Sequence, residues 1–300
     1  MITGIDICKS FEGFCALNHT NIHVPKGVVY GLVGPNGAGK TTLIRHIVGV
    51  LKADSGTLTL EEEEIFENPE AKKRMTYIPD DIFYFRQSDL KELKKLYQGL
   101  YPDFDDELYR EVLSCFPEIK ENIPIRRMSK GMQKQVAFLL AISCKPEVLI
   151  LDEPVDGLDP VMRRQIWKIL LEAVSKGHLT VLVSSHNLRE LEDVCDYVGV
   201  MHHGQIILEH SLSALQENIH KIQAAFSTED LPVIPEGFSV LNHGNTGRVH
   251  TWIIRGNKEE LLDYFHKQNP YFIDLLPLSL EEIFIYELGG EHYEVKELLM

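Results

Sequence analysis

Gly34-Pro-Asn-Gly-Ala-Gly-Lys-Thr-Thr42 is the part of this chain that constrains its structure most strongly, because it fits the phosphate-binding pattern G-x-x-x-x-G-K-[ST]. An apolar run at 28–33 predicts a buried strand before it, and apolar residues at helical spacing at 43–51 predict a helix after it. Such a loop requires a strand, a glycine-rich turn and a helix in this order. A turn of the same kind that binds no ligand is the alternative interpretation.

The residue types in this loop suit a nucleoside triphosphate. Glycines let the backbone turn tightly, so that successive N–H groups can point at phosphate oxygens at a helix N-terminus. Lys40 adds a positive charge for the β and γ phosphates, and the Thr41 hydroxyl suits Mg²⁺. The predicted nucleotide-binding residues of the loop are Gly34, Pro35, Asn36, Gly37, Ala38, Gly39, Lys40, Thr41 and Thr42.

Length and charge narrow the classes of protein to which the chain can belong. Its 300 residues are enough for a large domain with a smaller appendage, and 44% hydrophobic with 25% charged residues is ordinary globular usage. The net charge of -15 disfavours a partner that is bound by neutralising phosphates, so no nucleic-acid partner is expected. The nucleotide site must therefore be a locally positive pocket on an acidic protein.

Cysteine usage and the apolar segments predict a cytoplasmic protein. The five cysteines are widely spaced and form no C-x-x-C pair, which indicates reduced thiols. The N-terminus has no basic start followed by an apolar core, and no apolar run has the length of a membrane span. A role in a membrane process would thus need a second chain to supply the membrane part.

Two further apolar runs end in polar residues. The run at 148–151 is followed by Asp152 and Glu153, and the run that begins at 180 ends in His186. Open α/β sheets place their ligands at the carboxyl ends of the strands, so these residues and the phosphate loop are expected at one edge. An ordinary turn for the two carboxylates, and a structural role for the histidine, are the alternatives.

The rest of the first 218 residues completes an α/β domain. Short alternating segments before residue 34 predict an antiparallel β layer, and a helical pattern at about 86–145 predicts a helical insertion. Phe11 lies in the first of these segments, where an aromatic residue is either part of the core or a surface for an adenine ring. Ser129 precedes a helix and suits an N-cap.

The order of the motifs GPNGAGKTT, MSKGMQ, VLILDEP, DGLDP and VSSHN resembles the ATP-binding cassette ATPases, the motor subunits of ABC transporters. The resemblance covers about residues 1–218 and is closest to the ABC-2 export group and its Ytr-type subgroup. It implies a P-loop NTPase core with an antiparallel β layer and a helical subdomain. It also implies ATP and Mg²⁺ as cofactors.

The resemblance assigns roles to residues around the triphosphate. Phe11 matches the aromatic residue that stacks on adenine, and Thr41 and Asp152 match the residues that hold Mg²⁺. Glu153 matches the general base that orients the attacking water, and His186 matches the histidine that reaches the γ-phosphate.

In this family two cassettes close head to tail over two ATP molecules. Ser129 and Gly131 match the signature motif that completes the partner's site, and Asp159 matches a residue that crosses to the partner. The resemblance therefore implies a homodimer or heterodimer of cassettes.

Two positions depart from the family's pattern. Asp80 stands where the family usually has a glutamine that contacts the metal. We expect Asp80 to contact Mg²⁺ or its water, with capping of a turn as the alternative. Lys130 and Met132 replace commoner residues of the signature, while Ser129 and Gly131 remain, so a working signature is expected.

Residues 219–300 carry none of these motifs and predict a C-terminal α+β accessory domain. Four extended segments, a helix and a Ser279/Glu282 capping box before a last helix make up the pattern. Dimer contacts, regulation, docking to a membrane partner and simple coverage of the cassette all remain open as its role.

Together these patterns predict a Mg²⁺-dependent ATPase subunit that powers a separate transmembrane permease from the inner face of the cell membrane. A soluble cassette ATPase that acts on ribosomes or DNA is one alternative. Members of that kind carry two cassettes or long coiled coils, whereas this chain has one cassette with a compact helical insertion. An ATP-sensing regulator with little turnover is the other alternative.

Overall fold

The computed structural model describes residues 1–82, 87–154, 158–177, 179–226 and 232–288. The chain divides into two compact units. The first comprises residues 1–187 with 194–209, and the second comprises 188–193 with the chain from 210 onward. The first unit contains most of the expected cassette, residues 1–218, whose exact end stays a prediction.

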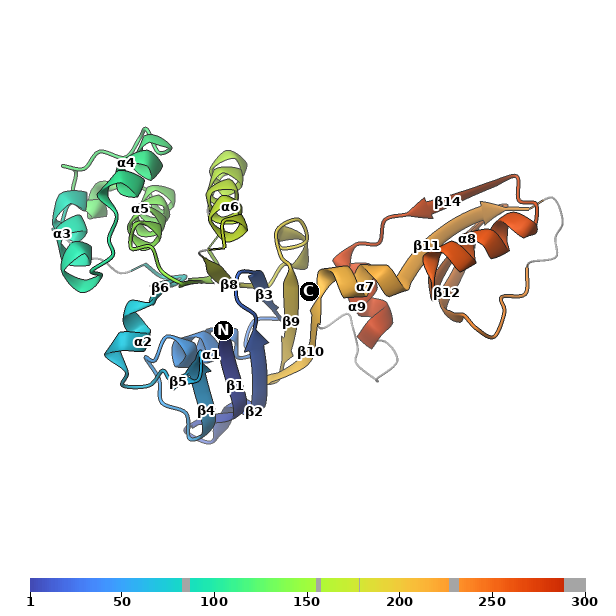
Figure 1. The fold of residues 1–300 in the computed structure, drawn as a ribbon, viewed down its shortest axis with the longest axis horizontal. Helices are drawn as coiled ribbons and strands as arrows, with labels where there is room; N and C mark the ends of the chain where they lie inside the picture. Colours follow the sequence, from blue (N-terminus) through green and yellow to red (C-terminus); the bar gives the residue numbers. More distant parts are fainter. Residues whose placement is uncertain (83–86, 155–157, 178, 227–231, 289–300) are drawn as a thin grey trace. The chain divides into compact units, whose positions relative to one another are not determined.

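An antiparallel sheet forms one layer of the first unit, as the alternating segments predicted (Figure 1). Strand β1 (Ile2–Phe11) lies between β2 (Phe14–Val24) and β4 (Ser55–Leu60), and the short β5 (Glu63–Glu64) pairs with β4. In register, Ile2 faces Val24 on one side and Leu60 on the other, and all three side chains are buried.

The second sheet has the strand order β10-β9-β3-β8-β7-β6. Four of its neighbouring pairs, from β9–β3 to β7–β6, are parallel. Strands β3, β7 and β8 are buried along their whole length, which is why their sequences are almost continuously apolar. Their carboxyl ends consequently meet at one edge. The strands are β3 (Val29–Val33), β6 (Met75–Ile78), β7 (Val148–Asp152), β8 (Thr180–Ser185), β9 (Tyr197–His202) and β10 (Gln205–Ser211).

Helix α1 (Lys40–Ile47) joins the two sheets into one core. Its buried Leu43, Ile44 and Ile47 belong to a cluster that includes Ile2 from the antiparallel sheet and Ile150 from the parallel sheet. The apolar spacing after the phosphate loop thus reflects a helix that is covered on two sides. The loop at its N-terminus is held by this packing.

The expected helical insertion is present. It contains α3 (Leu90–Leu100), α4 (Asp106–Ser114), η1 (Ile125–Arg127) and α5 (Lys130–Ser143). Side-chain caps begin these α-helices, and Asp89 with Glu92 forms a full capping box at α3. Two more helices complete the unit, α2 (Pro69–Lys73) and α6 (Pro160–Ser175).

The second unit is built on a four-stranded antiparallel sheet of order β12-β13-β11-β14. The core on one face contains Trp252 and Ile254 of the sheet with Leu261 and Phe265 of α8. The Ser279/Glu282 capping box is confirmed, because each residue accepts the other's backbone N–H, at 3.2 Å and 3.1 Å. Its elements are η2 (Leu188–Glu190), α7 (Leu212–Asn218), β11 (Ile219–Ala225), β12 (Ser239–Thr246), β13 (Val249–Arg255), α8 (Lys258–Lys267), β14 (Phe272–Leu276) and α9 (Leu280–Leu288).

Within the described ranges, no helix combines the length and the apolar composition that crossing a membrane would need.

His46 makes the first unit sensitive to acid. Its ring is only 3% exposed on α1, its Nδ1 donates to the Thr42 carbonyl oxygen at 2.7 Å, and burial lowers its pKa. In the unfolded chain the pKa is about 6.5, so the unfolded state binds a proton at a pH where folded His46 stays neutral. Above about pH 6.5 the ring is neutral in both states, and the full free energy of unfolding is available. As the pH falls through and below that value, the unfolded state takes up the proton first and the free energy of unfolding decreases.

We expect the free energy of unfolding to fall between about pH 7.5 and pH 5.5 in the unchanged protein. In His46→Gln this fall should be smaller by about 1 kcal/mol. Urea denaturation at the two pH values measures this difference. Glutamine keeps an N–H that can reach the Thr42 carbonyl, so the comparison isolates the titration. Equal losses in the two proteins would contradict the assignment.

Candidate functional site

The phosphate loop is shaped by close backbone contacts. A Cβ on Gly34 would lie 2.2 Å from the Met201 carbonyl oxygen, and a Cβ on Gly39 would lie 2.7 Å from the Ala16 carbonyl oxygen. Gly39 also has a φ of 109°, a backbone conformation that side chains disfavour. Only glycine fits these two positions, so the motif's spacing follows from packing against β2 and β9.

Lys40 lies at the first position of α1 with 5% of its surface exposed. Its Nζ donates to the carbonyl oxygens of Gly34 at 2.6 Å and Pro35 at 3.2 Å, and it lies 3.5 Å from Oε1 of Glu153. Burial lowers the pKa of this amine, while the nearby carboxylates oppose that change. The ammonium thus lies inside the loop, where an anion would approach it.

A pocket of about 310 Å³ opens beside this loop. It is lined by residues from β2, the phosphate loop, α1 and the segments after β6 and β7. Eight of the residues expected at the nucleotide site lie here, and Gly34, Pro35 and Ala38 build the loop without lining the pocket. The lining residues are Phe14, Ala16, Asn36, Gly37, Gly39, Lys40, Thr41, Thr42, Asp80 and Glu153.

Asp152 ends β7 with only 1% of its surface exposed. Its Oδ1 accepts hydrogen bonds from the Ser184 hydroxyl at 2.6 Å and the Thr41 hydroxyl at 3.2 Å, and its Oδ2 accepts from the Tyr77 hydroxyl at 3.5 Å. Burial, and then the charge of Asp152, raise the pKa of Tyr77 to about 12. Within the described ranges no ion pair joins this carboxylate to a basic side chain.

This donor set fits Mg²⁺. A buried carboxylate without a basic partner is costly, and a hard cation bound by oxygen would offset that cost. The Thr41 hydroxyl lies next to the Asp152 carboxylate, and Asp80 lines the same pocket.

Glu153 follows Asp152 in a strained conformation, with a φ of 46°. Its N–H donates to the Ser184 hydroxyl at 3.1 Å, and its carbonyl oxygen accepts from Nζ of Lys134 at 3.1 Å. Its carboxylate lies near Lys40 through Oε1 and accepts from Nδ1 of His186 at 3.0 Å through Oε2. The ends of β7 and β8 and the phosphate loop therefore converge, as expected from the sequence.

The aromatic residue at the pocket differs from the one that the sequence indicated. Phe14, at the start of β2, lines the pocket, whereas Phe11, at the end of β1, does not. The two residues are direct cross-strand partners in a hairpin, and Nζ of Lys9 lies 5.5 Å from the Phe11 ring centroid. A role for Phe11 at an adenine ring stays a prediction.

The expected residues Asp152 and His186 do not line this pocket, and neither do Ser129, Gly131 and Asp159. Ser129 caps α5 by accepting the N–H of Met132 at 3.2 Å, and Gly131 lies in the first turn of that helix. Asp159 caps α6 by accepting the N–H groups of Val161 and Met162. Of the DGLDP motif, residues 156 and 157 are outside the described ranges.

Sequence reasoning missed three residues that hold the site together, Ser184, Tyr77 and Lys134. Each acts through a contact between segments far apart in the chain. The sequence does contain an indication of Ser184, because two consecutive serines at the end of an otherwise apolar buried strand need hydrogen-bond partners.

Comparisons with known proteins agree with this geometry. The family model described as ABC transporter matches residues 17–156. ABC transporter ATP-binding protein YtrB of Bacillus subtilis is 30% identical over 97% of this chain and 99% of its own length. Bacitracin transport ATP-binding protein BcrA of Bacillus licheniformis is 27% identical over 97% of this chain and 98% of its own.

A solved structure of an ATP-binding subunit of an ABC transporter superimposes with a TM-score of 0.67 at 26% identity, covering 72% of this chain and 92% of that one. The similarity to YtrB over almost the full length confirms the expected Ytr-type resemblance. The chain therefore belongs to the family of ABC transporter ATP-binding proteins, and it is an ATPase of the cassette type.

Proposed function

We propose that this ATPase powers a separate transmembrane permease through ATP-driven closure of two cassettes. The observation that carries the proposal is the convergence of Lys40, Glu153 and His186 beside the buried Asp152. The names of the similar proteins YtrB and BcrA describe transport ATP-binding proteins, which supports the link to transport.

The phosphate loop binds the triphosphate through its N–H groups and through Lys40. Phosphoryl transfer depends mainly on positioning and on stabilising charge, and the loop supplies both. Thr41, Asp152 and Asp80 would hold Mg²⁺, with Asp152 acting through water. When bound, the ion neutralises charge on the β and γ phosphate oxygens.

Glu153 orients the water that attacks the γ-phosphate and accepts its proton on the carboxylate. His186 donates a hydrogen bond to that carboxylate in the structure, and we assign its ring to the γ-phosphate. The leaving group is ADP, and the products are ADP and inorganic phosphate. In this strained backbone conformation, Glu153 lies at the pocket wall before ATP binds.

A second cassette would complete the site. Ser129 and Asp159 are exposed at the N-termini of α5 and α6, and neither lines the pocket of its own chain. We assign Ser129 and Gly131 to the partner's ATP and Asp159 to the contact across the dimer, which is a homodimer or a heterodimer. The permease holds the pair at the inner face of the membrane, and no nucleic acid takes part.

Replacing Glu153 by glutamine tests the general base. We expect turnover to fall by about 100-fold or more, because the amide cannot accept the proton, while ATP still binds and a closed dimer accumulates. Phosphate release and size-exclusion chromatography with ATP measure the two effects. Glu172→Gln, an exposed carboxylate on α6 that pairs with Lys176, is the control and should hydrolyse ATP normally. Equal, negligible rates in the unchanged protein and Glu153→Gln would indicate a nucleotide-binding regulator instead.

The two hairpin aromatics can be separated by paired substitutions. We expect Phe14→Ala to weaken binding of a fluorescent ATP analogue by about tenfold, because stacking on a base is worth roughly 1–3 kcal/mol. Phe11→Ala should change the Kd by less than about twofold, because its ring lies outside the pocket lining. The reverse order would assign the adenine contact to Phe11.

Membrane attachment should require a protein. A chain with a net charge of -15 is repelled by anionic lipids, so we expect it to ignore protein-free vesicles of phosphatidylglycerol. Affinity purification of the tagged chain from detergent-solubilised membranes of its own cells should recover an integral membrane protein with several spans. Recovery of the chain from the soluble fraction alone would contradict the proposed permease.

A further inference from the structure

Lys134 connects helix α5 to the catalytic edge of the sheet. It lies on the helix that Ser129 begins, and its Nζ donates to the main-chain carbonyl oxygen of Glu153 at 3.1 Å. The same amine lies 3.8 Å from Oδ1 of Asp80. We propose that Lys134 is a positioning residue for hydrolysis, which fixes the backbone of Glu153, and that Asp80 supplies the negative charge that holds Lys134 in place.

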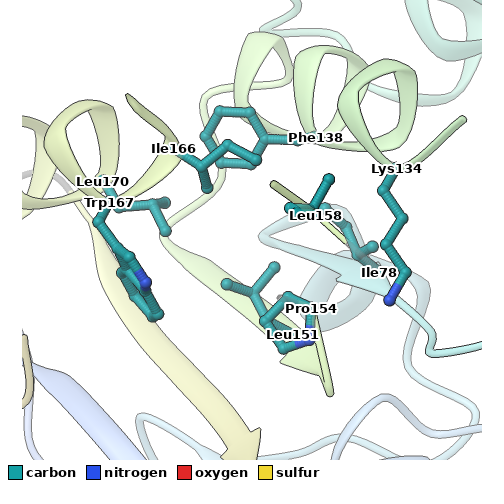
Figure 2. A pocket seen from close by; sticks show the side chains of 9 residues that line it. All are labelled: Ile78, Lys134, Phe138, Leu151, Pro154, Leu158, Ile166, Trp167 and Leu170. Atoms are coloured by element: carbon teal, nitrogen blue, oxygen red, sulfur yellow. The ribbon is translucent and has the colours of Figure 1, made fainter. Parts of the chain in front are cut away.

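The apolar surroundings of Lys134 increase the strength of these two contacts. Its side chain is 12% exposed and forms part of the wall of an apolar pocket between α5, α6 and the ends of β6 and β7. Figure 2 shows the side chain descending from α5 toward Ile78, in the pocket that Leu158 and Pro154 also line. An ammonium in such a place needs partners, and poor hydration strengthens the interactions that it makes. The carbonyl of Glu153 and the carboxylate of Asp80 are the partners nearest to it that the structure describes.

Glu153 is held at both ends of its backbone. Its φ of 46° lies in the left-handed region, which costs energy for any residue other than glycine. Ser184 fixes the N–H side and Lys134 fixes the carbonyl side. Without Lys134, the residue can relax toward the ordinary region of φ, which turns its carboxylate away from His186 and Lys40. The base would then lie in the wrong place for the attacking water.

Asp80 belongs both to the nucleotide pocket and to the surroundings of Lys134. It lines the nucleotide pocket and also faces Lys134. A carboxylate neutralises the ammonium, whereas an amide of similar size leaves it unbalanced. The charge of Asp80 therefore acts on hydrolysis through Lys134 and Glu153. This route is separate from any contact of Asp80 with Mg²⁺, which would not depend on Lys134.

The first test compares Lys134→Met with Lys134→Arg. Methionine keeps the apolar stem and removes the charge, so we expect kcat to fall by about 10- to 100-fold, while KM for ATP and the Kd of a fluorescent ATP analogue change by less than about threefold. Arginine can still reach the Glu153 carbonyl and should restore kcat to within about threefold of the unchanged protein. Lys176→Met, which breaks an exposed pair on α6, is the control and should leave kcat and KM unchanged.

The second test is a double-mutant cycle with Asp80→Asn. This exposed position carries little risk to folding, and we expect Asp80→Asn alone to lower kcat by about three- to tenfold without raising KM. In the Lys134→Met background the same change should lower kcat by clearly less, because only a contact of Asp80 with Mg²⁺ would then remain. An equal loss in the two backgrounds would overturn the route through Lys134.

Several outcomes would overturn the proposal as a whole. A normal kcat in Lys134→Met, or a loss that appears in KM or in nucleotide Kd, would show that Lys134 does not position the base. If Lys134→Met does not fold, Asp80→Asn decides alone, and an unchanged kcat refutes the route through Lys134. The proposal rests on the general base assigned above, and Glu153→Gln distinguishes the two, because it abolishes turnover whether or not Lys134 matters.

Discussion

The structure depends on burying charged groups at the edge of an apolar parallel sheet. Lys40 and Asp152 are almost fully buried, and Glu153 is nearly so, although isolated charges in such places cost several kcal/mol. Each is compensated by specific partners: carbonyl oxygens of the loop for Lys40, hydroxyls for Asp152, and Lys40 with His186 for Glu153. The strands must be covered on both faces for this edge to be dry. The polar site therefore depends on the same packing that forms the apolar core.

Glu153, where chemistry is expected, is one of ten described non-glycine residues with a positive φ. A left-handed conformation at a glutamate costs roughly 1–3 kcal/mol, and a hydrogen bond to a charged group is worth roughly 1.5–3 kcal/mol. The carbonyl contact from Lys134 is therefore large enough to offset the strain at Glu153. The N–H contact to Ser184 is a neutral hydrogen bond, worth roughly 1 kcal/mol, and offsets only the lower end of that range.

Local patterns predicted the parts of this site that lie at the ends of regular elements. Asp152, Glu153 and His186 were found because each follows an apolar strand, and parallel strands bring such residues to one edge. Lys134 and Ser184 were not found, because their partners lie 19 and 32 residues away in the chain and only tertiary packing pairs them. The sequence also did not single out Phe14, because the register of the hairpin decides which ring reaches the pocket.

Charge balance explains why an aspartate suits position 80. The carboxylate of Glu153 lines the same pocket as Asp80, so a second carboxylate there is less unfavourable when a cation lies near it. Lys134 is that cation, and its stem lies against apolar side chains. With an uncharged residue at position 80, the ammonium would lack this balancing charge. The two positions therefore form one electrostatic unit, in which a change at either alters the environment of Glu153.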